Sequence, residues 1–129
     1  MTDLFDADTA LRAFRAFALG WSTGDFEPYI AMLADEVEFS FPEGDLRGHV
    51  TGADGRARMI AKCRGHAGAG ERLSLGEPSH ISRGGDTTVF EFVAEGVLAS
   101  GHFRGEIAIA IAVRDHRVVG FREYYGFAG

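Results

Sequence analysis

One carboxyl group near the C-terminal end of the sequence is the first candidate for chemistry. The segment 118–125 alternates as a β-strand does, so its odd-numbered residues share one face: Val119, Phe121, Glu123 and Tyr125. Glu123 therefore stands on an otherwise apolar face, where burial disfavours the charged form of a carboxyl group unless that group is paired. A proton shared near neutral pH is what a general acid or base requires. We expect Glu123 to act in this way; the alternative is a structural ion pair or hydrogen bond within the core.

Two other polar positions could assist a reaction at Glu123. His49 lies with Arg47 in the turn-rich segment 43–52, beside the mouth that a loop before the next helix would form. Arg104 shares a strand face with Glu106, where pairing of charges across strands is the ordinary explanation. We take His49 and Arg104 as the residues that would help Glu123 orient a carbonyl or carboxylate, with exposed polar residues as the alternative for each.

Aromatic side chains could line an apolar ligand site beside this carboxyl group, and they are equally the ordinary contents of a core. The candidates for contact with a ligand are Trp21, Tyr29, Phe39, Phe90 and Tyr125.

The sequence gives no sign of a metal or of a bound cofactor. Its five histidines are scattered without H-x-x-x-H or H-E-x-x-H spacing. It also has no G-x-S-x-G, no phosphate loop and no dinucleotide fingerprint. We therefore expect chemistry without a metal or other cofactor.

The elements that must position these residues follow from hydrophobic periodicity and from turn-forming residues. Helices are predicted at 8–23, from Asp25 onward, and at 53–64, followed by a flexible connection at 65–70. Strands are predicted at 35–41, 72–83, 87–99, 103–114 and 117–125.

Helices followed by a run of long strands indicate an α+β fold. The turns between the last strands are short, which favours antiparallel neighbours with the helices on one side of the sheet. With 129 residues and no boundary in composition, the chain is predicted to form one domain, 1–129.

Composition restricts the partners and the location. The net charge of −6, spread along the chain, argues against binding to nucleic acid. The longest apolar run, Ile107–Val113, is too short to cross a bilayer as a helix, which needs about 20 residues. The acidic start of the chain does not resemble a secretory signal, and Cys63, the only cysteine, reads as a buried helix residue. We expect a cytoplasmic protein with no membrane partner.

Both faces of the strand at 103–113 are apolar, since isoleucines and a valine occupy one face and alanines the other. One face should cover the helices. The second should meet another subunit, so we predict a homodimer.

Four short segments carry a resemblance to a known family: Trp21–Asp25, Leu33–Val37, Gly52–Gly55 and Arg122–Tyr125. With the order of elements, they make the chain resemble the SnoaL-like branch of the nuclear transport factor two superfamily, which includes polyketide cyclases, ketosteroid isomerases and the phenazine-biosynthesis A/B proteins. The resemblance covers nearly the whole chain.

The resemblance implies a cone-shaped fold, in which a curved antiparallel sheet wraps the N-terminal helices and leaves a deep pocket, as in a cystatin-like roll. It also implies a dimer through the outer face of the sheet. Phenazine-biosynthesis A/B proteins have an arginine-glutamate-aromatic segment near the C-terminus whose glutamate acts as an acid, and Glu123 matches that position. The acidic pair of ketosteroid isomerases is not reproduced, since the strands at 87–99 and 103–113 contain no aspartate.

The residues and the resemblance together favour a cofactor-independent enzyme of the cyclase, isomerase or dehydratase type, acting on a hydrophobic small molecule. All three reactions need only a proton moved at a shielded carbon. The alternative from another class is a non-catalytic module that binds a small ligand or a partner protein. A third possibility is a structural subunit whose interior is filled by its own side chains.

Overall fold

A computed structural model describes residues 2–41, 48–50 and 52–125, and within these the side chains of residues 9–38 and 54–124. The helices of these residues are α1 (Thr2–Thr23), α2 (Glu27–Ile30) and α3 (Gly52–Gly68). The strands are β1 (Leu33–Phe41), β2 (Gly48–Val50), β3 (Arg72–Leu75), β4 (His80–Gly84), β5 (Thr87–Leu98), β6 (Gly101–Arg114) and β7 (Arg117–Tyr125).

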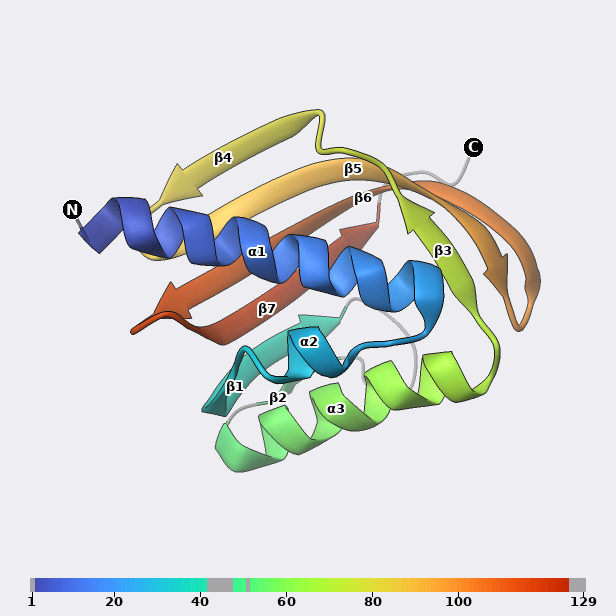
Figure 1. The fold of residues 1–129 in the computed structure, drawn as a ribbon, viewed down its shortest axis with the longest axis horizontal. Coiled ribbons are helices and arrows are strands. Elements are labelled where there is room, and N and C mark those ends of the chain that lie inside the picture. Colours follow the sequence, from blue (N-terminus) through green and yellow to red (C-terminus); the bar gives the residue numbers. More distant parts are fainter. Residues whose placement is uncertain (1, 42–47, 51, 126–129) are drawn as a thin grey trace.

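All of these strands belong to one curved sheet that wraps α1 (Figure 1). The strand order is β2-β1-β7-β6-β5-β3, and β4 pairs with β5 beyond this path. The predicted α+β class, with helices on one side of the sheet, is confirmed. β7 lies in the middle of the sheet, between β1 and β6.

The antiparallel pairing predicted for the last strands is confirmed, and the curved sheet also contains one parallel pair. β1 and β7 run parallel, with Phe39 opposite Phe121, while the other neighbours are antiparallel. A parallel pair needs a long crossover connection, and here that connection is most of the chain. Periodicity within one segment carries no information on such a distant pairing.

Three predicted boundaries also differ from the structure. The single strand expected at 72–83 is two strands, β3 and β4, separated at residues 76–79, which include Gly76 and Pro78. The loop expected at 43–52 contains β2. α3 continues to Gly68, through part of the connection expected at 65–70. Tertiary contacts described below compensate the low helix propensity of glycine in that last turn.

α1 places one face on the inner side of the sheet. Its buried residues recur at helical spacing: Ala10, Ala13, Phe14, Phe17 and Trp21. The ring of Phe14 stacks on Phe90 of β5 with centroids 4.7 Å apart and meets Phe92 edge-on at 5.1 Å. α3 packs beside β1 and adds Met59 and Cys63 to the same core. None of the described helices is long and apolar enough to cross a membrane.

The end of α1 turns the chain into α2 through a set of local hydrogen bonds. Gly24 has φ of +87°, which favours glycine, and its amide donates to the carbonyl of Gly20. The carboxylate of Asp25 then accepts from the amide of Glu27, the first residue of α2. Pro28 stands in the first turn of α2, as predicted. This turn brings Tyr29 back under α1.

A β-bulge adjusts the inner face of β7. Val118 lies opposite Val113 whereas Gly120 lies opposite Ala112, so Val119 is the extra residue. Val118 is consequently buried and Val119 is not, which corrects the predicted alternation at this end of the strand. Phe121 and Glu123 keep the inward positions that alternation predicted.

The outer face of the sheet carries small and charged side chains. Cross-strand neighbours there include Glu95 with Arg104 and Ala110 with Arg122. A shallow groove of about 200 Å³ crosses this face beside Ala110, Gly120 and Arg122.

Candidate functional site

Glu123 is the one charged residue among the buried positions that the structure describes. It lies on the inner face of β7, opposite Ile109 of β6 and two residues after Phe121. Only 7% of its surface is exposed, and its Oε2 has no hydrogen-bond partner among the described residues. A buried polar atom without a partner is costly, and native proteins hold few of them. This makes Glu123 the centre of the candidate site.

The hydroxyl of Tyr29 is a second polar group of the core without a partner in the described part of the chain. Tyr29 comes from α2 and is fully buried, with its ring 5.0 Å from that of Phe17 and 6.4 Å from that of Phe121. Burial raises the pKa of Tyr29 well above its ordinary value, and the nearby Cys63 and Glu123 side chains raise it further. Tyr29 is therefore a protonated hydroxyl, which can donate one hydrogen bond.

Cys63, on the inner face of α3, is a third buried residue near Glu123 and Tyr29. Burial raises the pKa of its thiol to about 12, with a further contribution from the charge of Glu123. The group is therefore a neutral thiol rather than a nucleophilic thiolate. One carboxyl group and two neutral donors thus lie together, and Glu123 contributes to the raised pKa of each donor. We call these three residues, Glu123, Tyr29 and Cys63, the Glu123 cluster.

Aromatic rings pack next to Tyr29 of the Glu123 cluster, on the side of α1. Phe17 contacts the rings of Trp21, Phe26 and Phe121 at centroid distances of 6.4, 6.1 and 5.1 Å. Edge-to-face arrangements dominate, as expected of aromatic pairs in a dense core. Through Phe121, this aromatic core reaches the strand that carries Glu123.

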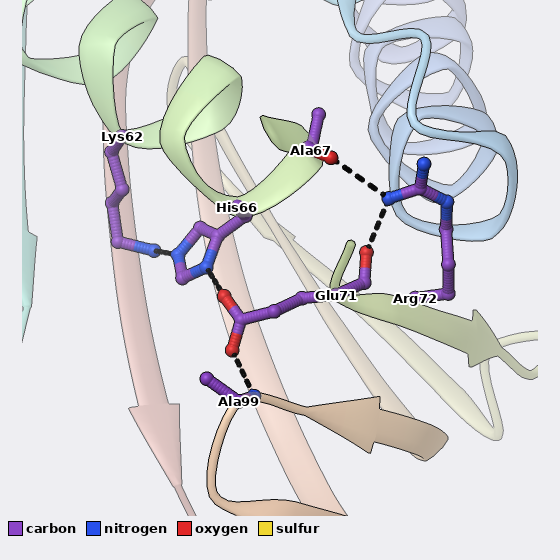
Figure 2. A network of polar contacts seen from close by, with 6 residues as sticks. All are labelled: Lys62, His66, Ala67, Glu71, Arg72 and Ala99. Atoms are coloured by element: carbon purple, nitrogen blue, oxygen red, sulfur yellow. Dashed lines mark hydrogen bonds and ion pairs between the residues drawn. The ribbon is translucent and has the colours of Figure 1, made fainter. Parts of the chain in front are cut away.

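A polar network lies at the end of α3, next to Trp21. Figure 2 shows His66 between Lys62 and Glu71: its Nε2 is 3.0 Å from the Lys62 Nζ, and its Nδ1 is 2.5 Å from the Glu71 Oε1. The imidazole ring lies against the indole of Trp21, with centroids 4.6 Å apart. Burial and the Lys62 ammonium lower the pKa of His66, against the opposing effects of Glu71 and Glu123.

Sequence reasoning missed His66, because it placed this residue in a connection after the helix. The signal was present in the spacing: Met59, Cys63 and His66 repeat at intervals of four and three residues, as one face of a continued helix does.

The structure brings only part of the predicted set together. Tyr29 belongs to the Glu123 cluster, and Trp21 contacts Phe17 and His66. Phe90 lies on the same inner face two strands away, in the row Phe90–Ile109–Glu123. Arg104 lies opposite Glu95 on the exposed outer face, on the other side of the sheet from Glu123.

Three predicted residues have side chains outside the described part of the structure: Phe39, His49 and Tyr125. Their backbones belong to β1, β2 and β7. Arg47 lies wholly outside the described residues. Within the described residues, no group of three or more histidine, cysteine, aspartate or glutamate side chains could hold a metal ion.

Comparison with known proteins identifies the fold. No family model matches the chain, and no curated protein matches it. Among solved structures, a nuclear transport factor two-like protein from Anabaena variabilis matches with a TM-score of 0.87 at 24% identity, over 97% of this chain and 92% of that one. A candidate isomerase from Bacillus subtilis matches with a TM-score of 0.71 at 19% identity, over 94% and 88%.

A third structure includes a bound small molecule. It is a protein from Catenulispora acidiphila with a ketosteroid isomerase-like fold, in complex with trimethylamine; the TM-score is 0.64 at 16% identity, over 89% of this chain and 85% of that one. At such identities the likeness concerns the fold alone. The chain has the α+β nuclear transport factor two-like fold, also described as ketosteroid isomerase-like.

Proposed function

We propose that this protein is a cofactor-independent enzyme of the isomerase, cyclase or dehydratase type, in which Glu123 moves a proton on a hydrophobic small molecule. The observation that carries the proposal is the buried carboxyl group whose Oε2 has no partner among the described residues. Functional sites are where proteins keep polar groups that their own fold does not satisfy. A substrate would supply the missing partner.

The neighbours of Glu123 suit proton transfer beside a carbonyl group. Glu123 takes a proton from the carbon next to the carbonyl, and negative charge then develops on the carbonyl oxygen. The hydroxyl of Tyr29, and more weakly the thiol of Cys63, are neutral donors that can stabilise this charge. Return of the proton to another carbon completes an isomerisation. If the substrate instead loses a hydroxyl group, which takes up that proton and leaves as water, the reaction is a dehydration.

The test does not depend on the identity of the product. A panel of apolar ketones with exchangeable α-hydrogens is incubated with the protein in deuterated water, and α-deuteration is followed by NMR. We expect exchange with the wild type and a loss of about 10²-fold or more in Glu123→Gln, the range typical of general acid–base catalysis.

The exposed Glu36 of β1 offers a matched control, since Glu36→Gln makes the same chemical change away from the cluster. Binding of the neutral dye N-phenyl-1-naphthylamine should persist in Glu123→Gln, which separates chemistry from binding. Undiminished exchange in Glu123→Gln would end the assignment of Glu123 as the proton carrier.

The alternative function is a non-catalytic module that binds a small ligand in the same place. The neighbour with bound trimethylamine favours it. A protonated amine would pair with the carboxylate of Glu123 and lie against the aromatic rings, where cations are attracted to ring faces. In calorimetry with trimethylammonium chloride, binding by the wild type that is lost in Glu123→Gln, without any α-exchange, would support this module over the enzyme.

We further propose that two copies of the chain associate through the outer faces of their sheets. Val93, Val97 and Tyr124 are exposed there, and Tyr124 lies opposite the small side chain of Ala108. A partly apolar sheet face is typical of a subunit interface. Sedimentation should show a dimer that Val97→Glu weakens, whereas a single monomeric species at all concentrations would contradict this arrangement.

A further inference from the structure

The contacts of His66 define its protonation state. An ammonium group can only donate, so the Nε2 that faces Lys62 must accept a hydrogen bond. The proton of the ring is then on Nδ1, where it is donated to the carboxylate of Glu71. The imidazole is therefore neutral and held in one tautomer, with both nitrogens engaged. With no nitrogen left for a substrate, His66 is not itself a proton carrier for the reaction.

The same network ties four elements together at one end of the sheet (Figure 2). The second oxygen of Glu71 accepts a hydrogen bond of 2.7 Å from the amide of Ala99, in the turn between β5 and β6. The guanidinium of Arg72 donates to the carbonyls of Ala67 and Glu71 and lies against Gly24 at the end of α1. These contacts join α1, α3, β3 and the β5–β6 turn, and the ring of His66 backs the indole of Trp21.

We propose that His66 is a positioning residue of the Glu123 site: while neutral it holds the indole of Trp21 in place, and when protonated it loses its hydrogen bond with Lys62 and loosens this end of the core. The role in ligand binding rests on the proposed function. The effect of His66 protonation on Lys62 and Trp21 does not involve a ligand and can be tested without one.

The charges around His66 set the sense of the switch. From α3 it faces the Lys62 ammonium, which opposes protonation, and before β3 it faces the Glu71 carboxylate, which favours it. Glu123 of β7 favours it as well, more weakly. The Arg72 guanidinium binds backbone carbonyls. A proton on Nε2 would replace the Lys62 hydrogen bond by repulsion between two cations.

Trp21 reports directly on this event, since it is the only tryptophan of the chain. A protonated imidazole in contact with an indole quenches the fluorescence of the indole. Emission of the wild type should therefore decrease as the pH is lowered, with a midpoint below 6.5, the ordinary pKa of histidine. Lys62→Met should move the midpoint up and Glu71→Gln should move it down. His66→Gln should abolish the titration.

His102 provides the matched control, since it pairs with Glu95 at 3.2 Å on the exposed outer face. His102→Gln should leave the titration of Trp21 unchanged. If circular dichroism shows that His66→Gln is unfolded, the opposite shifts in Lys62→Met and Glu71→Gln decide the matter. A wild-type emission that does not titrate, or midpoints that do not move in these two variants, would overturn the proposal.

A second readout tests positioning of the site. The affinity for N-phenyl-1-naphthylamine should fall several-fold as His66 is protonated, and this pH dependence should disappear in His66→Gln. A pH-independent affinity in the wild type would overturn the positioning role. Failure of Glu123→Gln to affect α-exchange would instead refute only the proposed enzyme, because the Trp21 titration does not depend on turnover.

Discussion

Replacing Glu123 with methionine should make the protein more stable while it removes the proposed activity. Methionine has a similar length and is apolar, so it fills the space of the glutamate side chain without leaving an oxygen that lacks a partner. Residues kept for function commonly cost stability, and their replacement by apolar residues recovers it.

The size of the gain follows from the environment of the side chain. Glu123 is 7% exposed, and a buried polar atom without a partner costs about 1–3 kcal/mol. For a domain of 129 residues the unfolding entropy is about 0.27 kcal/mol per kelvin. The expected increase in the melting temperature of Glu123→Met is therefore about 4–11 °C.

Differential scanning calorimetry at neutral pH measures this shift, and urea denaturation gives the matching free energy of unfolding. Glu36→Met is the control, because Glu36 is an exposed glutamate on a strand of the same sheet. Its effect should stay within about 0.5 kcal/mol. If Glu123→Met melts below the wild type, the carboxyl group is satisfied within the fold, and the reasoning that makes it a site for a ligand fails.

Three further predictions concern the surroundings of the site. The pKa of His66 is lowered in the folded state, so the unfolded chain binds more protons. The free energy of unfolding should be highest above about pH 6.5 and should fall as the pH drops through the lowered pKa. In His66→Gln, the midpoint of urea denaturation should depend less on pH over this range. Gly20→Ala would place a Cβ 2.2 Å from the Phe26 ring and should cost about 1–3 kcal/mol in thermal unfolding, whereas Gly65→Ala meets open space and should stabilise α3 by about 1 kcal/mol. Cys63, with its pKa near 12 and its side chain buried, should react with iodoacetamide only after denaturation; rapid labelling of the folded protein, measured by mass spectrometry, would contradict its placement.

Features that depend on local periodicity could be predicted from the sequence. The helical recurrence of Phe14, Phe17 and Trp21 and the alternation that turns Phe121 and Glu123 inward are both confirmed by burial. Each is a property of a few consecutive residues that must bury one face.

Features that depend on distant partners could not be predicted in the same way. The parallel pairing of β1 with β7 joins segments about eighty residues apart, as in the pair Phe39 and Phe121. The bulge at Val119 belongs to the pairing with β6 and leaves no mark in the alternation of β7. Neither feature follows from hydrophobicity alone.

The network around His66 shows the same limit for the candidate site. Gly65 and Gly68 suggested that the helix had ended, yet α3 continues because Arg72 and Glu71 bind groups in its last turn. Arg104 failed to join Glu123 for a simpler reason: its place on β6 alternates with the buried Gly105, so it points to the outer face.

The central place of β7 has a consequence for the order in which the protein folds. β1 is joined to the rest of the sheet through β7, so β1 and β2 cannot join that sheet until the strand that carries Glu123 has been synthesised. Until then the edges of β1 and β6 are exposed to other chains, which favours aggregation of incomplete protein. β7 both carries the catalytic candidate and makes the last connection of the sheet. A chain whose sheet is complete therefore already holds the carboxyl group of Glu123 in place.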